Sequence, residues 1–456
     1  MVPKEFQIQE PKNLGMPFNL AELKASFEEP QKELSEFKHC RVAKDSFIYN
    51  GNNIEIMSAV PDNFADSFII DGPYGINYMK QEWDQNVPSV EFWEEAYRIL
   101  KPGGYILSFG ATKTYHKMVA NVELAGFEIK DLVAWCYGQG SGLSSRNISN
   151  LMISEGIIEK DSDEANYWSK FKTKLKPAIE PILMAMKPIA EPTIAKNVLQ
   201  WGTGCINVED CLIPISDHKN FENNSRGNER TTMKEGSKLS LHSGGFKVNK
   251  NKKKIPNGRM PSNLLLDEQA QKILNQQFAA LNSERDYHIQ LLPSRYFYCS
   301  KPSITEKEFG LDDFEAKVIN PNIGNRRDFN SRCGNCEKKF VGAPESICKC
   351  ENPVTNNDVY KRKNHHSTVK PIDLLEYLIK LVTPEGGMIF DGYFGSGSLG
   401  AAVHRLDQGY RYFGIEINPE YYEIAVARCK AEYEKARNVK IDGISNKQHF
   451  STTPLK

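Results

Sequence analysis

The sequence predicts an α/β fold with an open, doubly wound and mostly parallel sheet. Two segments, 46–138 and 365–436, alternate strand-length apolar runs with helix-length amphipathic runs. Neither segment has enough strands to bury a sheet by itself, so we expect both to contribute to one sheet. The region 139–364 is rich in Asn, Lys, Gly and Ser and too long for a loop, which predicts an inserted domain. Residues 1–45 are expected to be an N-terminal extension, and 437–456 a C-terminal tail.

The first segment has the order of a βαβ unit. Ser67–Ile70 is a short apolar run typical of a buried strand, and Val90–Leu100 has helical spacing. Lys101–Gly104 is expected to break that helix before the next strand, Tyr105–Ser108. A helical connection between two strands predicts parallel pairing.

The second segment repeats this pattern. Ile372–Leu381 places its leucines on one helical face, and Pro384–Gly387 is expected to stop it. Met388–Phe390 and Tyr412–Ile415 then follow as strands.

The composition excludes several classes of protein. The chain has 456 residues, of which 40% are hydrophobic, so it can bury a substantial core. Its longest apolar runs fall far short of the roughly 20 residues of a membrane span, so none is predicted. Met1–Glu10 lacks the apolar stretch of a secretory signal, and we therefore expect a cytoplasmic location.

Charge is balanced overall but clustered locally. The 58 basic and 58 acidic residues give no net charge that would indicate a nucleic-acid partner. The basic clusters are solvated loops or phosphate contacts, and the sequence leaves both open. They comprise Lys247, Lys250, Lys252, Lys253, Lys254 and Arg259, then Arg326, Arg327, Arg332, Lys361, Arg362 and Lys363.

A polar turn follows the first strand at the edge where α/β sheets bind ligands. Asp71-Gly-Pro-Tyr-Gly75 comes directly after Ile70. An aromatic amine is a poor nucleophile, and the Asp71 carboxylate and Gly72 carbonyl could accept its N–H groups. Pro73 would stiffen the turn, and Tyr74 could stack on a base. The alternative is a turn without a chemical role, which these residues also favour.

A glycine loop follows the first strand of the second segment. Phe390-Asp-Gly-Tyr-Phe-Gly-Ser-Gly-Ser398 precedes an Ala-rich helix, and Glu416 ends the next strand about 25 residues after Asp391. A carboxylate at this spacing suits the hydroxyls of a ribose, so loop and acid together indicate an adenosine-containing cofactor. The loop lacks the Gly-Lys-Ser/Thr ending of a triphosphate site, but a dinucleotide site stays open.

Together these motifs resemble the beta group of DNA amino-methyltransferases. In that family an Asp-Pro-Pro-Tyr motif precedes a distant Phe-x-Gly-x-Gly motif. The resemblance extends to His366-Ser-Thr-Val-Lys-Pro371, which is similar to the family's His-Pro-Thr-Val-Lys-Pro signature. It also includes Trp83-Asp84 and Trp135-Cys-Tyr-Gly138.

The resemblance implies a Rossmann-like methyltransferase sheet and a site-specific enzyme that flips a base out of double-stranded DNA. Asp71, Gly72, Pro73 and Tyr74 would hold the target base. The residues implied to hold S-adenosylmethionine are Asp391, Phe394, Gly395, Ser396, Gly397 and Glu416, with Thr368 and Lys370 nearby. Region 139–364 would recognise the DNA sequence, as in restriction-modification enzymes. A homodimer and an association with the nucleoid, or with a phage host's cytoplasm, are compatible with the family.

Two positions depart from the family's motifs, and the residue type at Asp71 bears on which base is methylated. Gly72 and Gly392 replace family prolines, which leaves a DNA-binding protein with a degenerate core as an alternative. Asp71 resembles the adenine-N6 members, whereas cytosine-N4 members more often have Ser there, so cytosine N4 is a second alternative. An RNA or protein amine is a third possible acceptor. None of the ten cysteines follows a proline, which sets cytosine-C5 chemistry aside.

Four cysteines form a candidate zinc site. Cys333, Cys336, Cys348 and Cys350 make a CxxC and a CxC separated by loop-like residues, so residues 333–350 could form a zinc knuckle. His365 and His366 are possible substitute ligands. The alternative is an unmetallated loop.

Overall fold

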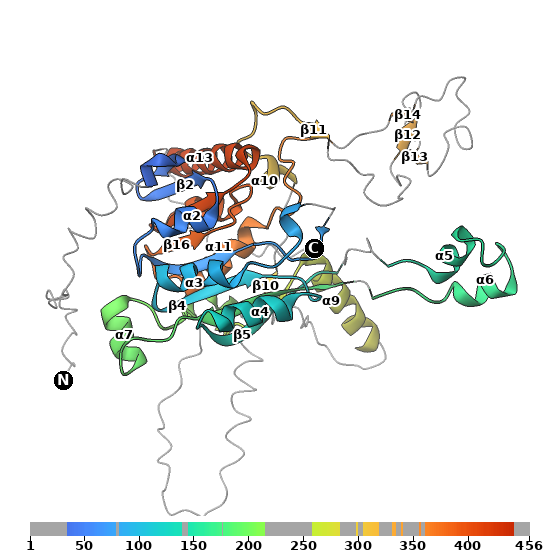
Figure 1. Cartoon of the computed structure of the whole chain (residues 1–456), viewed down its shortest axis with the longest axis horizontal. Coiled ribbons are helices and arrows are strands. Elements are labelled where there is room, and N and C mark those ends of the chain that lie inside the picture. The colour runs from blue at the N-terminus through green and yellow to red at the C-terminus, as the bar shows by residue number, and fades with distance from the viewer. Residues whose placement is uncertain are drawn as a thin grey trace, which may run out of the picture.

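A ten-stranded sheet forms the centre of the computed structural model (Figure 1). The structure describes residues 34–78, 82–138, 145–175, 177–214, 258–282, 298–299, 304–318, 331–333, 339–340, 355–356 and 361–441. The strands of the central sheet are β1 (Lys38–Ala43), β2 (Ser46–Asn50), β3 (Ala65–Ile70), β4 (Leu100–Phe109), β5 (Glu128–Cys136), β6 (Ile179–Met186), β9 (Leu264–Leu266), β10 (Tyr298–Cys299), β16 (Met388–Asp391) and β17 (Arg411–Glu416).

Strand order in this sheet is β1-β2-β17-β16-β3-β4-β6-β5-β9-β10. Pairing is parallel except between β1 and β2, β4 and β6, and β5 and β6. The sheet is therefore mixed but mostly parallel, which confirms the predicted α/β class. Short strands outside it are β7 (Ile213–Pro214) with β8 (Gly258–Arg259), β11 (Lys317–Val318) with β15 (Lys361–Arg362), and β12 (Ser331–Cys333) with β13 (Lys339–Phe340) and β14 (Thr355–Asn356).

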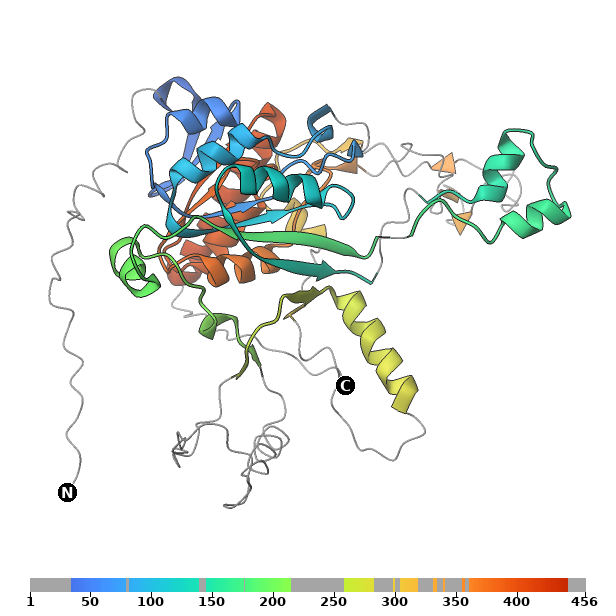
Figure 2. The same cartoon turned by 60° about the horizontal axis from the view of Figure 1, so that its bottom comes forward.

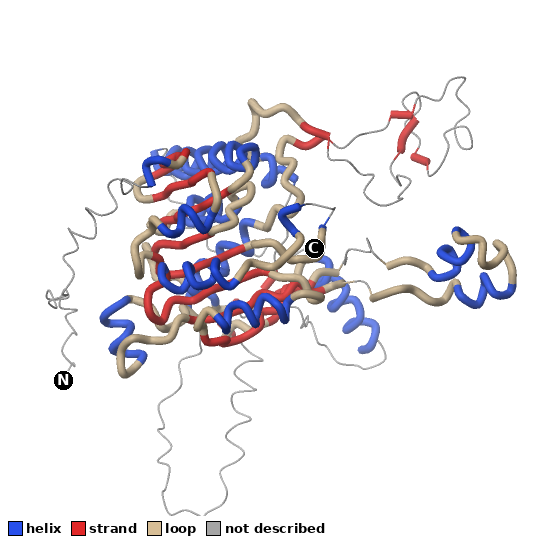
Figure 3. The backbone as a smooth tube through the Cα atoms, in the orientation of Figure 1, coloured by secondary structure: helices blue, strands red, loops and turns tan. Residues whose placement is uncertain are grey.

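Helices cover both faces of the sheet, as Figures 1 and 3 show. The helices are α2 (Asn53–Ser58), α3 (Val90–Ile99), α4 (Tyr115–Leu124), α5 (Ile148–Ser154), α6 (Asp163–Trp168), α7 (Ile194–Trp201), α9 (Glu268–Asn282), α10 (Ile304–Glu308), α11 (Ile372–Val382), α12 (Ser398–Leu406) and α13 (Pro419–Ile441). Three-residue 3-10 turns lie at η1 (Leu34–Glu36), η3 (Glu82–Asp84) and η4 (Glu209–Cys211).

Two cores result from the alternation of side chains along the buried strands. Ile69 and Leu107 point into the core formed with α11, α12 and α13. Phe68 and Ile106 point into the opposite core, formed with α2, α3 and α4. Every residue of β3 is buried, because this strand is covered on both faces and paired on both edges.

The two halves of the chain interleave within the sheet. Strand β3 lies between β4 from its own half and β16 from the other half. Strands β16 and β17 separate β3 from β2, although β2 and β3 are neighbours in the sequence. The carboxyl ends of β3, β16 and β17 consequently meet at one edge of the sheet.

The central sheet extends into regions expected to lie outside it. Strand β1, in the expected N-terminal extension, pairs with β2. Strands β6, β9 and β10 come from region 139–364, so part of the expected insert completes the sheet instead of forming a separate body. Most of the apolar residues of β6 are buried and make it part of the sheet. Helix α13 likewise continues to Ile441.

Helix α3 ends at Ile99, before the expected break, but the strand start predicted at Tyr105 is wrong: β4 begins at Leu100 and includes Lys101–Gly104. The cause is pairing with the chain after β6. The Gly103 N–H donates to the Lys187 carbonyl at 2.9 Å, and the Lys187 N–H donates to the Gly104 carbonyl at 3.0 Å. Among the helices of the described residues, none is both long and apolar enough to cross a bilayer.

Candidate functional site

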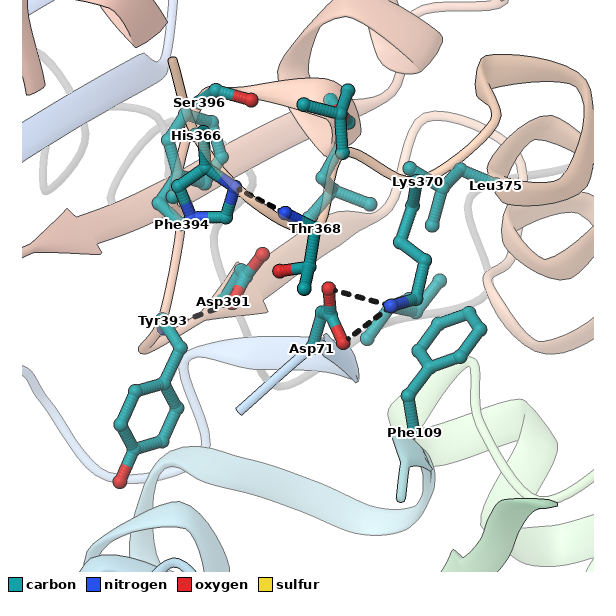
Figure 4. A pocket seen from close by; sticks show the side chains of 15 residues that line it. Asp71, Phe109, His366, Thr368, Lys370, Leu375, Asp391, Tyr393, Phe394 and Ser396 are labelled. Carbon is teal, nitrogen blue, oxygen red and sulfur yellow. Dashed lines mark hydrogen bonds and ion pairs between the residues drawn. The ribbon is translucent and has the colours of Figure 1, made fainter. Parts of the chain in front are cut away.

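A pocket lies where the carboxyl ends of β3 and β16 meet (Figure 4). Its volume is about 400 Å³, including space open to solvent. The residues that line it are Ile69, Asp71, Phe109, His366, Thr368, Val369, Lys370, Leu375, Asp391, Tyr393, Phe394, Gly395, Ser396, Ser398 and Leu399. Both polar motifs of the sequence therefore contribute to one pocket.

Four polar groups form a network on one side of this pocket. The Lys370 ammonium lies 2.8 Å from the Asp71 carboxylate and 3.0 Å from the Glu180 carboxylate. The Tyr74 hydroxyl lies within hydrogen-bond distance of three groups: 2.9 Å from Asp71, 2.6 Å from Glu180 and 3.0 Å from Lys370. The network joins β3, β6 and the segment before α11, and thereby both halves of the chain.

Burial and charge shift the pKa values of these groups. Burial raises the pKa of Asp71, and the Lys370 ammonium opposes that shift. Burial also disfavours the ammonium of Lys370, but the carboxylates of Asp71 and Glu180 outweigh it and raise the pKa of Lys370. Burial and the same two carboxylates raise the pKa of Tyr74 well above its ordinary value. Tyr74 and Lys370 therefore both keep their protons at neutral pH.

Asp84 holds the turn that carries Asp71 and Tyr74. It is 1% exposed, and its carboxylate accepts the backbone N–H groups of Tyr74 at 2.6 Å, Gly75 at 2.9 Å and Tyr78 at 2.7 Å. The Thr114 hydroxyl donates to the Tyr74 carbonyl. The Trp83-Asp84 pair, singled out by resemblance alone, thus has a structural role at Asp84.

The glycine loop after β16 forms another wall of the pocket. Gly395 and Gly397 have positive φ angles of 55° and 76°, a conformation that favours glycine. A Cβ atom on Gly397 would lie 2.9 Å from the backbone of Ala425, so the loop can approach α13 only without a side chain there. The Glu416 carboxylate accepts the N–H groups of Gly395 at 2.7 Å and Asn418 at 2.8 Å.

The carboxyl groups beside this loop are buried. Asp391 is 5% exposed, and burial raises its pKa well above the ordinary value. Burial raises the pKa of Glu416 to about 7, against the lowering effect of the backbone donors Asn418 and Gly395. Asp391, which lines the pocket, would in its ionised form suit a cationic ligand.

The two glycines that replace family prolines are explained by packing. A Cβ on Gly392 would lie 2.6 Å from the Phe92 ring, and one on Gly72 would lie 3.2 Å from the Tyr393 ring. The Phe92 and Tyr393 rings contact each other, with centroids 4.8 Å apart. An aromatic pair therefore occupies space that larger residues at these two positions would need.

His366 and Arg428 both lie against the glycine loop. His366 lines the pocket beside Gly395 and packs on Tyr421, with ring centroids 4.6 Å apart. Burial lowers the pKa of His366 to about 3, so it is neutral at neutral pH. Arg428 is 1% exposed and donates to the Ser396 carbonyl at 2.6 Å.

The structure brings most of the predicted site residues together. Asp71, Thr368, Lys370, Asp391, Phe394, Gly395 and Ser396 all line the pocket, whereas Gly72, Pro73, Tyr74, Gly397 and Glu416 are not among its lining residues. Gly397 belongs to the lining loop, and Glu416 is bonded to it. Lys370, expected beside the cofactor, ion-pairs with Asp71.

Sequence reasoning missed Glu180, Phe109, Tyr393 and Arg428. A carboxylate at the start of the apolar run of β6 was the available signal for Glu180, because charged residues are rare in buried strands. The candidate zinc cysteines lie outside the described residues, apart from the backbone of Cys333 in β12. Within the described ranges there is no group of three or more metal-ligating side chains. His365 lies 3.1 Å from Glu420.

Comparison with known protein families gives one match over most of the chain. A family model of N6/N4 type, described as "DNA methylase", matches residues 65–427. This range includes both motifs and the whole of region 139–364.

Individual relatives match over shorter ranges. The type II methyltransferase M2.DpnII of Streptococcus pneumoniae is 43% identical over 76 residues, which cover 17% of this chain and 28% of the relative. The type II methyltransferase M.HindIII of Haemophilus influenzae is 26% identical over 205 residues, which cover 35% of this chain and 64% of the relative. These matches thus span less than two thirds of either relative.

Solved structures match with low identity. The PvuII DNA methyltransferase, described as cytosine-N4-specific, is 11% identical with a TM-score of 0.38, covering 87% of this chain and 92% of that chain. The M1.HpyAVI–SAM complex is 13% identical with a TM-score of 0.34, covering 84% of this chain and 98% of that chain.

Asp84→Asn tests the anchoring of the Asp71–Tyr78 turn. The asparagine keeps one accepting oxygen but loses the charge and the second acceptor, and a hydrogen bond to a charged group contributes about 1.5–3 kcal/mol. We expect faster hydrogen exchange at the amides of Tyr74, Gly75 and Tyr78, measured by mass spectrometry, with the amides of β16 unchanged as the internal control. Unaltered exchange in the turn would show that Asp84 does not hold it.

Proposed function

Because the chain belongs to the N6/N4 DNA methylase family, we propose that it transfers a methyl group from S-adenosylmethionine to adenine N6 in double-stranded DNA. The observation that carries the proposal is the meeting of the Asp71 turn and the glycine loop in one pocket. A methyl donor in the loop and an amine at Asp71 would then be adjacent. Proximity of this kind supplies much of the rate when the donor is already reactive.

Asp71 is the proposed acceptor for the amine N–H. Its carboxylate is already bound by Lys370 and Tyr74, but two carboxylate oxygens offer about four acceptor positions. The Gly72 carbonyl is the proposed second acceptor. Tyr74, anchored through its hydroxyl, presents its ring for stacking with a base turned out of the duplex.

The charges of the network favour the reaction. Two carboxylates, Asp71 and Glu180, surround the single ammonium of Lys370, which leaves a net negative charge beside the amine. Methyl transfer places positive charge on the amine nitrogen. A preorganised negative environment stabilises that developing charge, so Glu180 belongs to the proposed machinery even though it is remote in sequence.

The loop residues fit an adenosine-containing cation. S-adenosylmethionine supplies an electrophilic methyl group when bound. Glu416 is the proposed acceptor for ribose hydroxyls, and Phe394, Gly395, Ser396 and Gly397 form the loop around the ligand, with Asp391 and Thr368 beside it. Neutral His366 adds no charge that would repel a cation.

The preference for adenine over cytosine N4 rests on residue type. Asp71, not Ser, occupies the first motif position. The packing of Phe92 and Tyr393 beside the two glycines supports this proposal over the degenerate-core alternative. Region 139–364 is the proposed reader of the DNA sequence, within a restriction-modification system.

Product analysis tests the proposed reaction. We expect the full chain to form N6-methyladenine from unmethylated DNA and labelled S-adenosylmethionine, measured by mass spectrometry of digested nucleosides. Asp71→Ala should lower transfer by about 10²-fold or more, since it removes a group that acts on the reacting amine. Its affinity for S-adenosylmethionine should stay within about twofold of wild type, because Asp71 is not a proposed cofactor ligand.

Asp62→Ala is the matched control, because Asp62 is 69% exposed and precedes β3 at the opposite edge of the sheet. It should keep full activity. If the product is N4-methylcytosine, the target base is cytosine and not adenine. Cofactor binding without any modified base would contradict a DNA methyltransferase activity.

Glu416 predicts a pH dependence of cofactor binding. Its pKa of about 7 means that the carboxylate becomes ionised as the pH rises through 7, and the ionised form is the stronger acceptor for ribose hydroxyls. Affinity should therefore rise by roughly tenfold from pH 6 to 8. Adenosine is the ligand for calorimetry, because it carries the ribose without the amino-acid groups. Glu416→Gln should bind weakly with a flat profile; an unchanged slope in this variant would assign the titration elsewhere.

We also propose that Cys333, Cys336, Cys348 and Cys350 hold one structural zinc ion. Four thiolates can fill a tetrahedral site completely, which gives such an ion no catalytic role. Elemental analysis of the full chain should find about one zinc per chain, and Cys333→Ser should lose it and melt at a lower temperature. Cys205→Ser, an exposed cysteine, is the control. A metal-free wild-type chain would contradict the site.

A further inference from the structure

An arm projects from the catalytic edge of the sheet between β5 and β6 (Figures 1 and 2). It consists of residues 145–175 and carries α5 and α6 at its tip. The two helices contact each other, and Ala165 and Ser149 are each 4% exposed, so the tip has a small core of its own. The arm is therefore an ordered structure, separate from the two cores of the sheet.

A stalk of two antiparallel segments of the chain supports the tip. Asn147 and Lys172 form an antiparallel bridge. The Thr173 N–H donates to the Arg146 carbonyl at 2.9 Å, and the Arg146 N–H donates to the Thr173 hydroxyl at 2.9 Å. The Ser145 hydroxyl closes the base of the stalk by donating to the Lys174 carbonyl at 2.7 Å. These bonds fix the backbone from which the stalk side chains project.

Most charges on the arm are separated by sign, with Lys160 on the acidic tip as the exception. The stalk cations are Arg146, Lys170, Lys172 and Lys174, and all four are exposed. The carboxylates of the arm lie on the tip between them in sequence: Glu155, Glu159, Asp161, Asp163 and Glu164. None of the four stalk cations forms an ion pair with another described residue. With Lys160, which lies among the carboxylates of the tip, the arm has five cations and five carboxylates and is neutral overall, and four of the five cations are on the stalk.

The stalk lies close to the catalytic network along the chain. Lys174 is six residues before Glu180, which contacts Tyr74 and Lys370. An extended chain of that length spans at most about 20 Å. Phosphates of one DNA strand follow each other about every 3.4 Å along the helix axis, so a duplex held at the pocket has several phosphates within such a distance of it.

We propose that the basic stalk of the arm binds the phosphate backbone of DNA next to the base that enters the pocket. This inference rests on the proposed function for the identity of the partner. The acidic tip repels phosphates, so contact is confined to the stalk and the arm lies alongside the duplex. The stalk contributes affinity and register without reading the base sequence, as phosphate contacts generally do.

The test is the salt dependence of DNA binding by a triple variant of the full chain, Lys170→Gln with Lys172→Gln and Lys174→Gln. Each lost phosphate contact should lower the slope of log affinity against log salt by about 0.9. We expect a decrease of about 2 to 3 in the slope and at least about tenfold weaker binding of a random-sequence duplex, measured by fluorescence anisotropy at roughly 50–200 mM salt.

Two further variants separate charge from other effects. The triple Lys→Arg variant at the same positions should keep the wild-type slope, because it retains the charges. The control triple replaces Lys44, Lys196 and Lys430 with Gln; all three are exposed, and Lys44 and Lys196 lie toward the opposite edge of the sheet. It removes the same total charge and should keep the wild-type slope. Thermal unfolding and S-adenosylmethionine affinity should be unchanged in every variant.

The outcomes distinguish the two proposals. Equal slopes for the stalk triple and the control triple would overturn the stalk proposal while leaving the proposed function intact. A wild-type chain that binds no DNA would overturn both. If the stalk triple binds DNA more weakly but keeps the wild-type slope of log affinity against log salt, the lysines do not act through phosphates. That result also contradicts the inference.

Discussion

The buried ammonium of Lys370 is the contact on which the site depends. It lies between carboxylates from β3 and β6, and it comes from a segment about 300 residues beyond Asp71. A buried charge is tolerated only when it is paired and hydrogen-bonded, so each member of the network requires the others. The same contact that orders the Asp71 turn therefore also joins the two halves of the chain at their shared edge.

At two turns of this edge, glycines packed against aromatic rings take the place of prolines. Where the family has prolines that stiffen both turns, this chain has Gly72 and Gly392 with the Phe92–Tyr393 pair packed against them. The rigidity that a proline ring gives locally is supplied here by packing, and by the carboxylate of Asp84 under the first turn. Sequence motifs record the residues of a turn but not what holds it.

The sequence allowed the central part of the fold and most of the pocket to be predicted, because those depend on local patterns. Strand–turn–helix order placed Asp71 and Asp391 at the ends of buried strands, and Glu416 at the end of the next one. Glu180 could not be assigned, since its partners are defined only by the antiparallel position of β6 beside β4. Helix α3 ends before Lys101–Gly104 as expected, but the start of the next strand was misplaced for the same reason: long-range pairing with Lys187 draws these residues into β4 despite the turn preference of Pro and Gly.

The interleaved strand order also has a consequence for the growing chain on the ribosome. Strands β2 and β3 are made early, but β16 and β17, which fill the space between them, are made last. At roughly 5–20 residues per second, the delay is of the order of tens of seconds. During that time the apolar edge of β3 has no partner, and such edges are prone to aggregation. The nascent protein is therefore most dependent on chaperones, or on rapid completion of synthesis, at the strand that leads into the Asp71 turn.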